Sequence, residues 1–294
     1  MSSRTLVLWV WAGVVVVGSP ACGQTKTLYE KASPYSKITV TEDQRGLRTL
    51  LFDNEVRQSV GKVGDPNHLE LPYARAMPAG LAFVDAPQRI LIVGLGGGTI
   101  PTFLHKHYPK TQIDVVDIDP DVVDVAKRFF GFREDATLRA YVNDGRRFVE
   151  ESRRPYDVIF LDAYGPDNIP YHLATREFLE AVRRKLTPRG VAVANVWSSN
   201  SNPLYHSMVR TYQEVFDELY LQDVPGAGNR ILVALPRQGR FQTADLAQRA
   251  GRIAREKNFR FDLEKLVAAG CRQLIEKDAE GDVLRDGHEP GKRP

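Results

Sequence analysis

The chain has 294 residues, of which 43% are hydrophobic and 26% are charged, and its formal net charge is +3. This composition can bury a full core without disulfides or a metal ion, and no long basic stripe with interleaved aromatic residues indicates nucleic-acid binding. We therefore expect one main domain with small additions, no metal site and no nucleic-acid partner.

Residues 1–23 have the pattern of an export signal. An arginine precedes the uncharged apolar run 6–17, which is too short to span a bilayer comfortably, and small residues follow. Cleavage after Ala21 would leave Cys22 as a lipidated first residue, and cleavage after Gly23 fits the small-residue rule equally well. The alternatives are an uncleaved anchor, which would be the only membrane attachment, and a mis-assigned start. We expect a periplasmic, secreted or lipid-anchored protein if the signal is functional, and a cytoplasmic protein otherwise.

Residues 27–70 are predicted to form a small antiparallel β-hairpin domain. Three runs within residues 35–63 alternate apolar with polar side chains, as the strands of a one-sided sheet do. Polar turns separate these runs, and Asp53-Asn54 suits a tight hairpin.

Residues 71–240 are predicted to form a nucleotide-binding domain. Residues 89–93 are apolar and β-branched, as in a buried parallel strand, and a turn follows that contains Gly94, Gly96, Gly97 and Gly98. Without side chains, these glycines let the backbone approach a ligand closely. Asp117, with Ile118 beside it, ends the next strand, twenty positions after Gly97. A carboxylate at that place accepts hydrogen bonds from both hydroxyls of an adenosine ribose.

Further strands and helices alternate up to residue 235. Strands are predicted at residues 137–142, 156–161, 191–196, 219–222 and 231–235, and helices at 121–130, 145–151 and 174–186. The short turn at 225–228 makes the last strand antiparallel. The result is an α/β, Rossmann-like sheet of seven strands with one antiparallel strand at its edge. That arrangement is typical of S-adenosylmethionine-dependent transferases rather than of nicotinamide dehydrogenases.

The C-terminal part carries weaker signals. Residues 241–276 are predicted to contain two amphipathic helices, at 243–257 and 262–269. Residues 277–294 are charged and contain glycine, which predicts a mobile tail. Cys271 and Cys22 lie at opposite ends of the chain, so no disulfide framework is implied.

Two aspartates follow strands at the sheet edge where doubly wound folds bind ligands. Asp162 ends the strand at 156–161, where it is placed to take a proton from an amine that attacks a sulfonium carbon. A helix cap or a turn carboxylate is the alternative. Asp144 follows the preceding strand, and a cap on the next helix is equally compatible. The loop at 164–172, which contains Tyr164 and Asp167, is either a lid over an amine pocket or an ordinary rigid connection.

A β-hairpin domain in front of this sheet resembles the spermidine synthase family, the aminopropyltransferases, over about residues 35–236. The resemblance implies that the glycine turn holds an S-adenosyl donor. It implies that Asp162, at the end of the strand YDVIFLD, takes the proton from the attacking amine. The other residues that it implicates are Asp117 for the ribose, Asp144 and Gly145 for the adenine amino group, Gln58 for a further donor contact, and Tyr73 for the aminopropyl channel.

The chain departs from the family at charged positions. The family turn reads GGGDG, and the position of its aspartate, which binds the primary amine of the donor, is Gly97 here. A second family aspartate, which helps to hold the diamine, is replaced by Gly165, and the pair after the channel tyrosine is Ala74-Arg75. These departures resemble a divergent spermidine-synthase-like branch with a GLGGG turn, which includes a methyltransferase domain that acts on protein amines. Asp167 would partly compensate for the lost charge.

Three functions remain open. The first is transfer of an aminopropyl group from decarboxylated S-adenosylmethionine to a small amine or polyamine, and the family match favours it marginally. The second is N-methyl transfer from S-adenosylmethionine, because Gly97 in place of the aspartate removes a charge that would repel the methionine carboxylate. The third is a non-catalytic adenosine-binding module, against which Asp162 argues. A homodimer is compatible with each of them.

Overall fold

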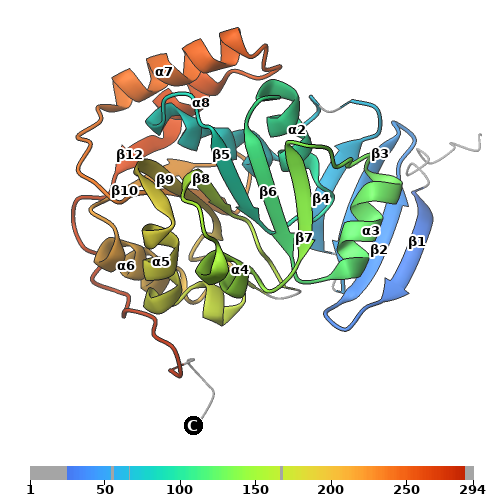
Figure 1. Cartoon of the computed structure of the whole chain (residues 1–294), viewed down its shortest axis with the longest axis horizontal. Coiled ribbons are helices and arrows are strands. Elements are labelled where there is room, and N and C mark those ends of the chain that lie inside the picture. The colour runs from blue at the N-terminus through green and yellow to red at the C-terminus, as the bar shows by residue number, and fades with distance from the viewer. Residues whose placement is uncertain (1–24, 54–55, 66, 166–167, 289–294) are drawn as a thin grey trace, which may run out of the picture.

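The computed structural model describes residues 25–53, 56–65, 67–165 and 168–288, so the predicted signal segment lies outside the described residues. Within these ranges the chain forms a four-stranded sheet near the N-terminus and an eight-stranded sheet that follows it. Figure 1 shows the smaller sheet beside one end of the larger sheet. This arrangement confirms the predicted α/β fold with a small antiparallel sheet in front.

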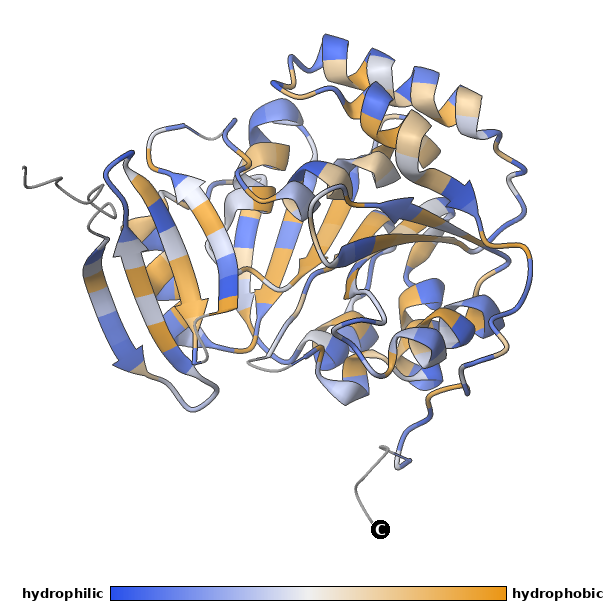
Figure 2. Ribbon diagram, turned by 180° about the vertical axis from the view of Figure 1, so that it is seen from behind, coloured by the Kyte–Doolittle hydropathy of each residue, from blue (hydrophilic) through white to orange (hydrophobic). Residues whose placement is uncertain are grey.

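The N-terminal sheet is antiparallel throughout and has four strands in chain order. Its strands are β1 (Lys26–Ala32), β2 (Lys37–Glu42), β3 (Leu47–Phe52) and β4 (Val56–Lys62). The alternating hydropathy, visible in Figure 2, places Ile38, Val40 and Leu50 on one buried face. That face packs against Val122 and Val125 of helix α3 (Pro120–Phe129). The polar first strand, β1, carries no such periodicity and was not among the three predicted runs.

The larger sheet has the order β12-β10-β11-β9-β8-β5-β6-β7. Its strands are β5 (Arg89–Val93), β6 (Gln112–Asp117), β7 (Leu138–Val142), β8 (Tyr156–Leu161), β9 (Leu186–Trp197), β10 (Glu218–Asp223), β11 (Asn229–Leu235) and β12 (Cys271–Gln273). Strands β5 to β9 pair in parallel, whereas β11 is antiparallel to both of its neighbours. All the strands predicted from the sequence are present.

The predicted place of the antiparallel strand is wrong. Strand β11 lies between β9 and β10, and the short strand β12 adds an eighth strand at the edge. A short turn makes β10 and β11 neighbours, but it does not determine which of the two pairs with β9. The strand from Ile231 to Leu235 is completely buried, so the more central place removes more apolar surface from water.

Helices cover both faces of the larger sheet. One face carries η1 (Met77–Phe83), α2 (Thr99–His107), α7 (Thr243–Glu256) and α8 (Leu263–Gly270), and the other carries α4 (Gly145–Glu151), α5 (Arg176–Arg184) and α6 (Tyr205–Val215). Two short helices lie in connecting segments. Helix α1 (Pro72–Ala76) directly precedes η1, and η2 (Tyr171–Leu173) lies between β8 and α5. Within the described ranges, no helix has the length and apolar character needed to cross a membrane.

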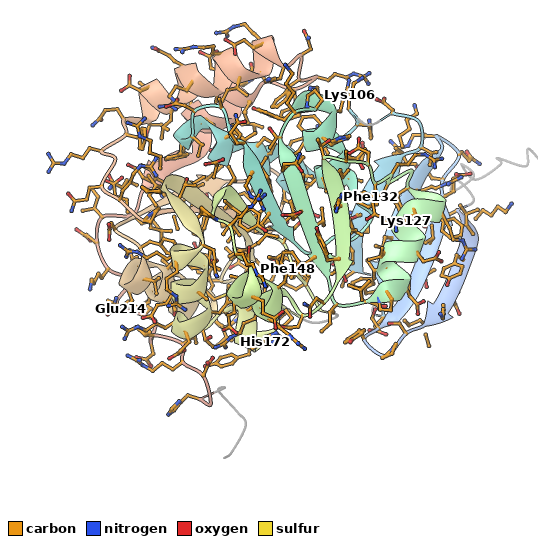
Figure 3. The ribbon with its side chains drawn as sticks, viewed as in Figure 1. Lys106, Lys127, Phe132, Phe148, His172 and Glu214 are labelled. Atoms are coloured by element: carbon orange, nitrogen blue, oxygen red, sulfur yellow. The ribbon has the colours of Figure 1, made fainter. Side chains whose placement is uncertain are left out.

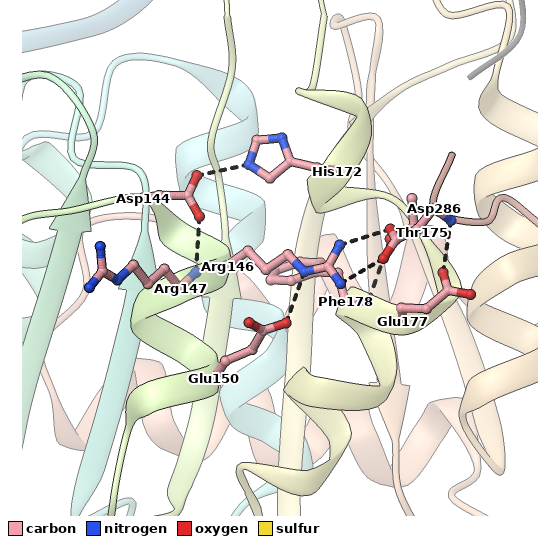
Figure 4. Close-up of polar contacts among 9 residues, drawn as sticks. All are labelled: Asp144, Arg146, Arg147, Glu150, His172, Thr175, Glu177, Phe178 and Asp286. Atoms are coloured by element: carbon pink, nitrogen blue, oxygen red, sulfur yellow. Dashed lines mark hydrogen bonds and ion pairs between the residues drawn. The ribbon is translucent and has the colours of Figure 1, made fainter. Parts of the chain in front are cut away.

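Part of the tail that we expected to be mobile is packed against the domain. Leu284 is only 5% exposed, and its carbonyl accepts a hydrogen bond from the Arg176 amide at 2.8 Å. The Asp286 carboxylate accepts hydrogen bonds from Nη1 and Nη2 of Arg146, at 2.8 and 2.7 Å (Figure 4). Two adjacent apolar residues, Val283 and Leu284, give no periodic signal in a charged segment, which is why the sequence pattern did not predict this packing.

Candidate active site

A cavity of about 350 Å³ opens at the carboxyl ends of β5, β6 and β8, beside strand β4 of the N-terminal sheet. The smaller sheet therefore closes one side of the pocket that the larger sheet offers. The structure gathers most of the predicted site residues in its wall: Gln58, Tyr73, Gly94, Gly96, Asp117, Ile118, Asp144, Gly145, Asp162 and Tyr164. Asp167 lies outside the described residues.

The glycine turn divides into a part that lines the cavity and a part that packs behind it. Gly94 has φ 99°, and a side chain there would collide with the backbone of Asp162, so glycine is required. Gly97 and Gly98 do not line the cavity. A Cβ on Gly97 would lie 2.9 Å from the Ser59 Cβ, and a Cβ on Gly98 would lie 2.9 Å from Phe132. These two glycines therefore let the turn pack against its neighbours.

Asp117 is held by backbone amides at the end of β6. Its Oδ2 accepts from the Leu95 amide at 2.8 Å, and its Oδ1 accepts from the Asp119 amide at 3.0 Å. Burial raises the pKa of Asp117, although these amides favour its ionised form. Both oxygens keep a second lone pair, which can accept from a pair of ribose hydroxyls. Ile118 beside it is 39% exposed and offers an apolar surface to a flat ring.

Asp144 caps helix α4 and also lines the cavity. Its Oδ1 accepts from the Arg147 amide at 2.9 Å, and its Oδ2 lies 2.8 Å from Nε2 of His172 (Figure 4). Burial acts to raise the pKa of Asp144, but the hydrogen bonds from Arg147 and His172 outweigh it and lower this pKa. Both sequence interpretations, cap and cavity residue, thus apply to the same side chain.

His172 is a cavity residue that the sequence patterns did not single out. It lies on η2 beside α4 (Figure 3), and its side chain is 45% exposed. Its link to Asp144 joins two segments that are 28 residues apart in the chain. No local motif encodes such a contact.

Asp162 ends β8 within the cavity wall. Its Oδ1 accepts a hydrogen bond of 2.8 Å from Nδ2 of Asn195 on β9. Among the described residues no backbone amide donates to this carboxylate, so the structure does not support the cap or turn alternative. Burial raises the pKa of Asp162 to about 7, and the Asn195 hydrogen bond partly opposes that rise. A carboxylate with such a pKa can accept a proton near neutral pH.

Two tyrosines flank Asp162 and are held by backbone carbonyls. The Tyr73 hydroxyl donates to the Gln58 carbonyl at 3.0 Å, and the Tyr164 hydroxyl donates to the Asn195 carbonyl at 2.9 Å. The Tyr164 ring also stacks on Trp197, with centroids 5.4 Å apart. Burial raises the pKa of both phenols well above the ordinary value, so both stay neutral. Together they form an apolar wall whose hydroxyl oxygens can still accept hydrogen bonds.

The wall of the cavity is rich in acidic side chains and poor in basic ones. Four carboxylates line it, those of Asp117, Asp119, Asp144 and Asp162, and the described lining includes no lysine or arginine. Such a wall attracts a cationic ligand and repels a carboxylate. Across the described part of the chain, no group of three or more His, Cys, Asp or Glu side chains is arranged to hold a metal ion.

Comparison with proteins of known sequence finds two kinds of relative. Residues 74–233 match the spermine/spermidine synthase domain. The chain is 37% identical over 244 residues to a polyamine aminopropyltransferase of Vibrio vulnificus, with 80% of each chain covered. It is also 34% identical over 190 residues to the eEF1A lysine and N-terminal methyltransferase of Bos taurus. That match covers 58% of this chain but only 27% of the methyltransferase.

Solved structures give the same two groups. A probable spermidine synthase from Corynebacterium glutamicum superposes with a TM-score of 0.71 over 90% of this chain and 99% of its own, at 24% identity. Human methyltransferase-like protein 13, solved in complex with SAH, superposes with a TM-score of 0.60 at 31% identity, over 64% of this chain and 93% of its own. Both groups of relatives are transferases, and the resemblance is consistent with an S-adenosyl donor. With its domain match and its 37% identity across most of its length, the chain belongs to the spermine/spermidine synthase family.

Proposed function

We propose that the chain transfers an aminopropyl group from decarboxylated S-adenosylmethionine to a small amine of the polyamine type. The observation that carries this proposal is the charge of the cavity wall, four carboxylates without a lysine or arginine among the described lining residues. Decarboxylated S-adenosylmethionine has two positive charges and no carboxylate. S-adenosylmethionine adds a carboxylate, which these aspartates would repel.

The donor is assigned to the glycine-turn side of the cavity. The two free lone pairs of Asp117 accept the ribose hydroxyls, and Ile118 packs on the adenine ring. Asp144 keeps an acceptor for the adenine amino group, beside the small Gly145, since its two recorded partners leave lone pairs free. Gln58, on β4, borders the same side of the cavity.

The reaction is a displacement at the carbon that is bonded to the sulfonium. The acceptor nitrogen forms a bond to the aminopropyl carbon while the carbon–sulfur bond breaks. The electron pair of the broken bond goes to the sulfur, which departs as a neutral thioether. The attacking amine must lose one proton, and Asp162 accepts it. Tyr73 and Tyr164 flank the methylene groups of the acceptor and exclude water from the reacting nitrogen.

The alternative is N-methyl transfer from S-adenosylmethionine. The similarity to the eEF1A lysine and N-terminal methyltransferase supports it, as does glycine at position 97. The position of Gly97 behind the cavity wall weakens the second argument, because a carboxylate there would need Ser59 and Phe130 to move. The relatives reported above are transferases, which argues against a non-catalytic adenosine-binding module.

Calorimetry with the two donors tests the proposal. Decarboxylated S-adenosylmethionine is expected to bind at least about tenfold more tightly than S-adenosylmethionine, a difference of about 1.4 kcal/mol. Incubation with a series of primary diamines should then yield aminopropylated products detected by mass spectrometry. Equal or tighter binding of S-adenosylmethionine, together with a methylated product, would establish the methyl alternative instead.

We also propose that residues 1–23 direct export. Protein recovered from its native host should begin at Cys22 or Gln24, as N-terminal sequencing would show. An intact Met1 on cytoplasmic protein contradicts export. Because S-adenosyl donors are made from ATP in the cytoplasm, an exported enzyme would also need a donor supply outside it.

A further inference from the structure

We propose that Asn229 and Asn195 form a relay that orients the Asp162 carboxylate, so that its Oδ2 alone receives the proton of the attacking amine. The inference rests on the proposed function, in which Asp162 is the proton acceptor. Asn195 and Asn229 act here as positioning residues, since they act on the substrate through Asp162.

The relay consists of two hydrogen bonds across three strands. Nδ2 of Asn229, at the start of β11, donates to Oδ1 of Asn195 at 2.9 Å. Nδ2 of Asn195, on β9, donates to Oδ1 of Asp162 at 2.8 Å. Asn195 is 2% exposed and lies in an otherwise apolar stretch of β9. A buried amide in a strand is costly unless its groups are paired, and here both are paired.

The contacts allow only one orientation of the Asn195 amide. An ionised carboxylate can only accept, so the amide nitrogen must face Asp162. Turning the amide over would set its oxygen against the carboxylate and its NH₂ group against that of Asn229. Both contacts would then be repulsive, so the carboxylate sets the donor direction of Asn195, and the hydrogen bond from Asn229 stabilises it.

This arrangement leaves one carboxylate oxygen of Asp162, Oδ2, available to the proton of the amine. Oδ1 accepts from Asn195, whereas Oδ2 has no hydrogen-bond partner among the described residues. Tyr164, whose hydroxyl donates to the Asn195 carbonyl, holds the same segment of β9 from the cavity side. The amine proton therefore has one unoccupied carboxylate oxygen to reach, at a fixed place in the cavity.

The relay also opposes the effect of burial on Asp162. Burial raises the pKa of this carboxyl to about 7, and the Asn195 hydrogen bond acts in the opposite direction. The titratable groups that face Asp162 are the phenols of Tyr73 and Tyr164. The other ionisable groups around the cavity are those of Tyr35, Asp117, Asp119, Asp144 and His172. None of these neighbours places a fixed positive charge beside Asp162, so the neutral amide of Asn195 is the group that stabilises the ionised carboxylate.

The test compares pH profiles of kcat/KM for Asn195→Leu and Asn229→Leu, which keep the side-chain size but remove the amide. Without the Asn195 donor, the acid limb should move up by about one pH unit, which lowers the rate at pH 6 about tenfold. Asn229→Leu should move it in the same direction by a smaller amount, because the Asn195 amide then loses the hydrogen bond that stabilises its orientation toward Asp162. Gln248→Leu on the exposed face of α7 is the matched control and should leave the profile unchanged.

A double variant separates this inference from the proposed function. If Asn195 acts through Asp162, Asn195→Leu should not lower the residual rate of Asp162→Asn any further. Wild-type pH profiles in the two leucine variants, with Asp162→Asn inactive, would overturn the relay but keep the proton acceptor. An active Asp162→Asn would instead overturn the proposed function. Asn229→Leu still decides the question if Asn195→Leu does not fold, as thermal melting would show.

Discussion

Replacing Asp162 with asparagine separates proton transfer from donor binding. Asparagine keeps the shape of the side chain, and its oxygen can still accept from Nδ2 of Asn195. It cannot take a proton from the amine. We expect a loss of about a hundredfold or more in kcat, with the donor dissociation constant changed less than about twofold.

The same variant should be more stable than the wild type in alkaline solution. The folded-state pKa of Asp162 is about 7, against an ordinary value of 3.8, so the folded chain binds this proton more tightly than the unfolded chain. The contribution of the Asp162 carboxyl to the stability of the wild type is therefore fully present below about pH 4 and is lost as the pH rises from 4 to 7. At pH 8 the ionised carboxylate costs the folded state up to about 4 kcal/mol, which asparagine removes.

The assays are single-turnover product formation with each donor, calorimetric donor titration, and thermal melting at pH 4 and pH 8. The melting temperature of Asp162→Asn should exceed that of the wild type at pH 8 and approach it at pH 4. Asp124→Asn, on the exposed side of α3, is the control and should change neither activity nor this pH dependence. Full activity of Asp162→Asn with either donor would refute the assignment, and Tyr164 and Asp167 would then be tested as the base.

Three further substitutions examine the donor site and the packing around it. Asp117→Ala should weaken donor binding by about 1 to 3 kcal/mol in calorimetry, while Asp124→Ala leaves it unaltered; equal affinities would reject the ribose contact. Gly97→Ala places a Cβ 2.9 Å from Ser59 and should lower the free energy of unfolding by about 1 to 3 kcal/mol in urea titrations. Leu284→Asp should cost about 2 to 4 kcal/mol by the same measurement, because it buries a charge, whereas Ile275→Asp, at an 82% exposed position, should cost little. A neutral Leu284→Asp would mean that the tail is not packed in solution.

Local patterns predicted the strands, and most of the residues that they singled out for the donor line one cavity. Strand β5, the turn at Gly94 and the acid at Asp117 follow one another within 29 residues, so their relation is set by backbone geometry and strand length. Asp162 was predicted as the proton acceptor for the same reason, since the carboxyl ends of central parallel strands meet at the ligand edge of the sheet. Gly97 and Gly98 belong to the same motif, but the sequence alone did not separate packing from ligand contact, because that depends on where Ser59 and Phe132 lie.

The amino-acid sequence by itself determined the alternation of strands and helices, because hydrophobic periodicity and glycine stereochemistry act over a few residues. Only the tertiary structure decided the place of β11, the packed tail, and the partners of the carboxylates. Asn195 meets Asp162 across 33 residues, and His172 meets Asp144 across 28. Such pairs form when whole strands and loops are brought together by burial of the core, and no local rule records which polar side chains then come within hydrogen-bond distance.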